Sequence, residues 1–135
     1  MRRQILKALS AAGVLSVLAA IGVLAQGANF EATPTWEGIK ACNGQPIQSP
    51  SPRFVLKNIP AATTEIEFKM TDLDAPAFNH GGGKIRYAGA PEIAPGAFTF
   101  IGPCPPSTHR YEWTVTARDA AGQRLATTRA TKKYP

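Results

Sequence analysis

The sequence predicts an all-β protein, an antiparallel β-sandwich with few or no helices, preceded by an N-terminal export signal. Three observations predict this fold class. Apolar and polar residues alternate with a period of two, and no stretch after residue 25 carries an apolar stripe at helical spacing. Glycine and proline, 12 of each among 135 residues, separate the alternating stretches. Because this length has room for one domain, residues 26–135 are predicted to form a single domain.

Residues 1–25 have the three parts of a secretory signal peptide. A basic start precedes residues 8–25, which carry no charge, and Val23-Leu24-Ala25 places small residues at −3 and −1 of a cut after Ala25. The alternative is an uncleaved anchor, because 18 apolar residues can just span a bilayer. The predicted location is periplasmic or secreted.

Two stretches of the remaining chain, residues 64–70 and 110–118, alternate most clearly. Each predicts a strand with one buried and one solvated face. The predicted buried residues are Ile66, Phe68 and Met70 in the first stretch, and Tyr111, Trp113, Val115 and Ala117 in the second. Shorter strands are predicted around residues 54–56, 85–87 and 98–100. A plain turn is favoured for residues 81–83, and residues 126–134 fit either a closing strand or a short helix.

The two cysteines, Cys42 and Cys104, are predicted to form a disulfide, because an exported chain meets oxidising conditions. The alternative is two reduced thiols too far apart to meet. The sequence contains no CxxC motif, so neither redox catalysis nor a zinc ribbon is supported.

The formal net charge of +6 comes partly from the predicted signal. Without residues 1–25, twelve basic and nine acidic residues remain, and the basic ones are scattered, with only Lys132 and Lys133 adjacent. Nucleic-acid binding requires a clustered basic patch, so no nucleic-acid partner is predicted.

Three segments hold nearly all the polar residues that could carry chemistry. They are DLDAP at residues 72–76, NHGGG at 79–83, and GPCPP at 102–106, which leads into HRY at 109–111. The first and third are predicted to lie at strand ends. Neighbouring antiparallel strands place the end of one beside the start of the next, so these two segments can meet.

The DLDAP and GPCPPSTHRYEW blocks resemble the signatures of the phosphatidylethanolamine-binding protein family, also called Raf kinase inhibitor-like proteins. The small bacterial members are the closer match, and the resemblance covers about residues 49–120. It implies a Greek-key β-sandwich whose small pocket, at one end, receives phosphate-like groups, including phospholipid head groups. Two departures stand out: Leu73 replaces the family's proline, and a lone His80 stands where the family has a Trp-His or His-His pair.

Matched motif by motif, the resemblance implies seven ligand-binding residues: Asp72, Asp74, His80, Gly102, Pro103, His109 and Tyr111. An anion there is expected to accept hydrogen bonds from histidine, from the Tyr111 hydroxyl and from the Gly102 N–H. Structural alternatives exist for four of them: the two aspartates can cap turns, His80 can be merely exposed, and His109 can bond a backbone carbonyl. Arg110, on the opposite face from Tyr111, is expected to form a structural ion pair.

The predicted function is that of an exported, non-enzymatic binding protein for a small anionic or phosphorylated ligand, with no catalytic residue, metal or cofactor. The second possibility is an inhibitor of a protein partner, of protease or kinase type. The third is a metal-dependent hydrolase, because two histidines and two aspartates are enough ligands for zinc. Their spacing matches no metallohydrolase motif, and the sequence has no GxSxG serine.

Overall fold

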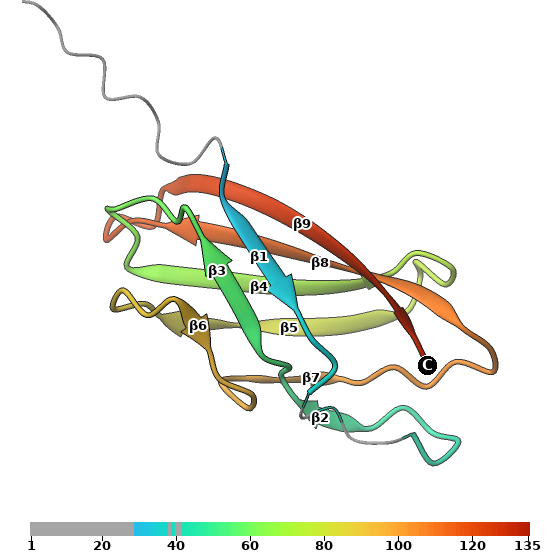
Figure 1. Ribbon diagram of the computed structural model, residues 1–135. Coiled ribbons are helices and arrows are strands. Elements are labelled where there is room, and N and C mark those ends of the chain that lie inside the picture. The colour runs from blue at the N-terminus through green and yellow to red at the C-terminus, as the bar shows by residue number, and fades with distance from the viewer. Residues whose placement is uncertain (1–28, 38, 40–41) are drawn as a thin grey trace, which may run out of the picture.

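The computed structural model describes residues 29–37, 39 and 42–135, and this part of the chain is all-β (Figure 1). Its described residues contain no helix, and therefore none long and apolar enough to cross a membrane. The predicted export signal at residues 1–25 lies outside the described residues. The predicted all-β antiparallel fold class is confirmed.

The described strands form two layers, all with antiparallel pairing (Figure 1). The large sheet has the order β5 (Asn79–Arg86), β4 (Glu65–Asp72), β8 (His109–Arg118), β9 (Arg124–Tyr134). The layer in front of it in Figure 1 holds a three-stranded sheet, β1 (Glu31–Pro34), β3 (Phe54–Lys57) and β6 (Glu92–Ile93). The same layer holds the pair β2 (Gln48–Pro50) and β7 (Thr99–Ile101). Residues 126–134 thus belong to a closing strand.

Aromatic side chains join the two layers. The Phe54 ring of β3 lies 4.7 Å from the Phe68 ring of β4, measured between centroids. The Trp113 ring of β8 meets Phe54 edge-on at 5.2 Å and Phe100 of β7 at 5.0 Å. The seven residues predicted to face inward from β4 and β8 are all buried, so the period-two interpretation of both stretches is confirmed.

The chain leaves the large sheet after β5, passes through β6 and β7 in the other layer, and returns as β8 beside β4. β7 contacts β5 without pairing to it, and β8 pairs with β4 on the side opposite β5. This return places the end of β4 beside the start of β8, with Asp72 paired to Tyr111.

Residues 81–83 do not form a plain turn, so that expectation is wrong. They lie within β5 and pair with β4, and a bulge there is marked by Gly81 at φ +72°. A Cβ on Gly82 would collide with the backbone carbonyl of Phe68, and one on Gly83 would lie 2.5 Å from the Phe98 Cβ. The glycines are required because the neighbouring strand and the core leave no room for side chains.

Candidate functional site

Segments far apart in the sequence meet at one end of the sandwich and enclose a cavity of about 160 Å³. The end of β4, the start of β5, the start of β8 and the segment after β7 all contribute to its wall. Five of the seven sequence-predicted ligand residues line this cavity: Asp72, His80, Gly102, His109 and Tyr111. The structure therefore brings most of the predicted site together.

Asp72 organises the cavity through both of its carboxylate oxygens. Oδ1 accepts hydrogen bonds from the N–H groups of Asp74 (2.9 Å) and Ala75 (3.1 Å), which closes an Asx turn. Oδ2 lies 2.7 Å from Nδ1 of His109. Burial favours a higher pKa for Asp72, but the bonds from His109 and from the backbone outweigh it and hold this pKa below its usual value. The side chain is therefore both a turn cap and an anionic support for His109.

Both histidines have one ring nitrogen committed to a protein acceptor. Nδ1 of His80 lies 2.7 Å from the carbonyl oxygen of Ile101, and Nδ1 of His109 faces the Asp72 carboxylate. Because a carbonyl or an ionised carboxylate only accepts, each Nδ1 carries a proton. Neither Nε2 has a hydrogen-bond partner in the part of the chain that the structure describes, so the two Nε2 atoms are left for a ligand.

His80 is buried, with 3% of its surface exposed, which removes the interpretation of a merely exposed loop residue. Its ring lies 4.6 Å from the Phe78 ring and meets the Tyr111 ring edge-on at 5.5 Å. These contacts hold the imidazole in one orientation in the cavity wall.

Tyr111 is buried on the inward face of β8, and its hydroxyl group stays protonated. Burial raises the pKa of this phenol well above its usual value, and the negative charge of Asp72 raises it further. Hydrogen bonding to Asp72 also raises this pKa, so the Tyr111 hydroxyl directs its proton toward the Asp72 carboxylate in the cavity wall.

Asp74 and Pro103 do not line the cavity. The Asp74 carboxylate accepts bonds from the backbone N–H of Arg110 (2.7 Å) and from its Nη2 (2.8 Å). The Arg110 side chain and backbone lower the pKa of Asp74 to about 2. Pro103 is fully buried. Asp74 and Pro103 therefore have structural roles in the DLDAP and GPCPP segments. The ion pair expected for Arg110 is present, and its partner is Asp74.

Gly102 lines the cavity, but its N–H donates to the carbonyl oxygen of Ile47 at 2.9 Å. That N–H is therefore not left for an anion, contrary to the expectation from sequence. The residue is tightly packed, because a Cβ there would lie 3.1 Å from the Cβ of Ser49. Glycine at position 102 thus lets the segment after β7 pack closely against β2 and the residue before it.

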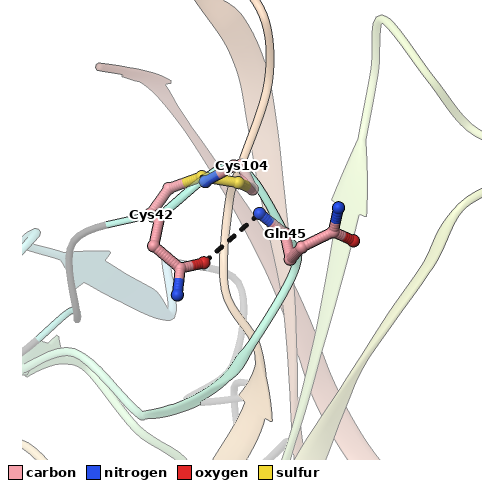
Figure 2. The surroundings of a disulfide bond; sticks show 5 residues. Cys42, Gln45 and Cys104 are labelled. Carbon is pink, nitrogen blue, oxygen red and sulfur yellow. Dashed lines mark hydrogen bonds between the residues drawn. A yellow bond between two sulfur atoms is a disulfide. The ribbon is translucent and has the colours of Figure 1, made fainter.

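The predicted disulfide between Cys42 and Cys104 is present, and Figure 2 shows it beside Gln45. The two Cα atoms are 5.2 Å apart across a sequence separation of 62 residues. Cys104 and Pro46 both line the cavity, so the bond holds one part of the wall against another. A disulfide is compatible with the oxidising compartment that the predicted export implies.

The sequence analysis missed an apolar rim around the cavity. Phe78, with 41% of its surface exposed, is the large hydrophobic residue that stands out as exposed among those described. The other apolar rim residues are Pro46, Ala75, Pro105 and Pro106. Pro105 and Pro106 belong to the GPCPP segment singled out from sequence, but no rim was predicted, and an isolated Phe in a polar segment was the available sign of it.

No group of three His, Cys, Asp or Glu side chains among the described residues is arranged to hold a metal ion. Comparisons of the chain with protein-family models, with curated proteins and with solved structures found no match.

Proposed function

We propose that this protein is an exported, non-enzymatic binding protein of the phosphatidylethanolamine-binding protein type, and that its cavity receives a phosphate group. One observation carries the proposal. Two imidazoles with fixed Nδ1–H groups leave both Nε2 atoms unpaired in a cavity that also contains a protonated tyrosine hydroxyl.

The hydrogen-bonding pattern determines how an anion is held. A neutral imidazole with a proton on Nδ1 offers only a lone pair at Nε2, whereas an imidazolium offers an N–H donor. A charge-assisted bond to phosphate is stronger than a neutral one. The Asp72 carboxylate, 2.7 Å from Nδ1 of His109, would stabilise a positive charge on this ring, which suits an anion at Nε2.

The apolar rim adds a preference for the organic part of the ligand. Phe78 presents an exposed ring beside His80, and prolines form much of the remaining rim. A phosphate ester with an apolar substituent buries this surface, and inorganic phosphate does not. The favoured ligand class is therefore a phosphate ester, including a phospholipid head group with the start of its apolar chain.

The test is a titration of phenyl phosphate and of inorganic phosphate, followed by amide chemical shifts, with wild type, His109→Ala, Phe78→Ala and the control Thr108→Ala. Thr108 is exposed next to His109 and does not line the cavity. His109→Ala is expected to weaken both ligands about tenfold or more. Phe78→Ala is expected to weaken only phenyl phosphate, and Thr108→Ala neither.

Equal affinities of wild type and His109→Ala would exclude the cavity as the phosphate site. Release of phosphate from phenyl phosphate during the titration would support the hydrolase alternative instead.

A further inference from the structure

Strand pairing gathers scattered charges on the outward face of the large sheet, here called the basic face. Its basic side chains are Lys69, Lys84, Arg86, Arg110, Arg118, Arg124, Arg129 and Lys133. Its acidic side chains are Glu65, Glu67 and Glu112. Eight cations and three carboxylates therefore share one face.

The remaining described residues have the opposite balance. Three basic residues lie elsewhere: Arg53, Lys57 and Lys132. Six acidic residues lie elsewhere: Glu31, Glu37, Asp72, Asp74, Glu92 and Asp119. The molecule therefore has a strong charge asymmetry, with its positive side on the basic face.

Ion pairs neutralise only half of these cations. The three glutamates of the face contact Lys84, Arg118 and Arg129, and Asp74 contacts Arg110. Among the described residues, no acidic side chain lies within 4.0 Å of the other four cations. These four are Lys69 on β4, Arg86 on β5, and Arg124 and Lys133 at opposite ends of β9.

The unpaired cations are spread in two dimensions. Four strands about 4.8 Å apart, with about 3.3 Å per residue along each, place them over an area of about 15 by 25 Å. Their separation across strands and along β9 suits a planar array of negative charges better than a single anionic chain.

The other outward side chains of this face are small. Asn79, Thr71, Thr114, Thr116, Thr127 and Thr131 fill the positions between the charges, together with Gly82. The face has no aromatic side chain on which the bases of a single strand would stack, and no helix that would enter the major groove of a duplex.

We propose that the basic face docks on the surface of an anionic lipid bilayer. The contact is electrostatic and peripheral, because no apolar side chain of the face is available to enter the hydrocarbon region. Each Lys or Arg near such a surface strengthens binding about fivefold, and salt at several times the physiological concentration screens the attraction.

The experiment is co-sedimentation of the purified protein with vesicles of phosphatidylcholine alone or mixed with phosphatidylglycerol, at low and high salt. Binding to the mixed vesicles is expected to exceed binding to phosphatidylcholine vesicles, and high salt is expected to abolish this difference. Lys69→Gln/Lys133→Gln should weaken binding about 25-fold. The charge-matched control Lys57→Gln/Lys132→Gln removes the same charge elsewhere and should change it about twofold or less.

Two further measurements separate the basic face from the cavity and from other polyanions. With the cavity weakened by His109→Ala, the salt-sensitive preference for mixed over phosphatidylcholine vesicles should persist, and loss of that preference would overturn the proposal in favour of head-group recognition by the cavity. Equal weakening by both double variants would overturn the proposal. So would retention on immobilised heparin without binding to vesicles, which would indicate a linear polyanion.

Discussion

At the scale of single residues, Asp72 connects stability to the candidate site. One of its oxygens closes the Asx turn of the DLDAP segment, and the other holds the His109 ring. The two alternatives considered from sequence, a turn cap and a ligand-site residue, are therefore not exclusive. A single carboxylate does both because its two oxygens point to different elements.

Asp72→Asn is expected to destabilise the fold by about 1.5–3 kcal/mol and to weaken phosphate-ester binding. The amide oxygen can still cap the turn, but the amide NH₂ group cannot accept a hydrogen bond from the Nδ1–H group of His109. Urea unfolding and ligand titration measure the two effects. The matched control is Asp119→Asn, since Asp119 caps a turn through the N–H groups of Ala121 and Gln123 without contacting a histidine. Unchanged binding in Asp72→Asn would contradict this role.

Acid is expected to destabilise the fold through the same segment. The pKa values of Asp72 and Asp74 lie below their usual values in the folded state, that of Asp74 at about 2. Carboxylates of this kind stabilise the fold above an unfolded pKa of about 3.9, and the stabilisation is lost as the pH falls through the folded pKa. The urea midpoint should therefore decrease between about pH 4 and pH 2. A double variant, Asp72→Asn/Asp74→Asn, should show a flatter profile, and an identical slope would refute the assignment.

At the scale of elements, β5 is shaped by what packs against it. Three consecutive glycines would ordinarily weaken a strand, but here they let β5 approach β4 and the core closely. The same strand begins with His80, whose ring reaches the carbonyl of Ile101 in β7. The close approach of β5 thus positions a site residue.

Gly82→Ala is expected to cost about 3 kcal/mol or more, because its Cβ would collide with backbone rather than with a movable side chain. The control is Gly122→Asn, at a turn with φ +78° and open space around the Cβ position. Asparagine tolerates that conformation, so the control should cost about 1 kcal/mol. Thermal or urea unfolding compares the two. Similar losses would show that the glycines of β5 are not required by packing.

At the scale of the whole molecule, the disulfide links the segment between β1 and β2 to the segment between β7 and β8. It encloses much of the sandwich within one covalent loop and forms part of the cavity wall. Global stability and the shape of the candidate site therefore depend on the same bond.

Cys42→Ala/Cys104→Ala is expected to lower the free energy of unfolding by about 4 kcal/mol, the loop-entropy value for this separation. Phosphate-ester affinity should fall as well, because Pro46 and Pro105 are no longer held together across the cavity. Urea unfolding with and without reductant measures the first effect, and titration measures the second. Reductant should not change the stability of the double variant. Full wild-type affinity in that variant would show that the disulfide does not maintain the shape of the candidate site.

The sequence by itself determined the all-β class and the inward faces of β4 and β8. It also predicted that DLDAP and GPCPPSTH can meet, and it favoured pairing of the two cysteines over two reduced thiols. Period-two alternation and strand-end position are local signals, and a lone pair of cysteines has a single partner choice. None of these inferences required coordinates.

Only the tertiary structure decided which hydrogen-bond partners the site residues have. Asp74 and the N–H of Gly102 are taken by Arg110 and Ile47, partners that are distant in sequence. The basic face was hidden for the same reason, because its cations are scattered along the chain and only strand pairing makes them neighbours. A hydrogen bond or an electrostatic patch depends on distances in space, which alternation and spacing along the chain do not contain.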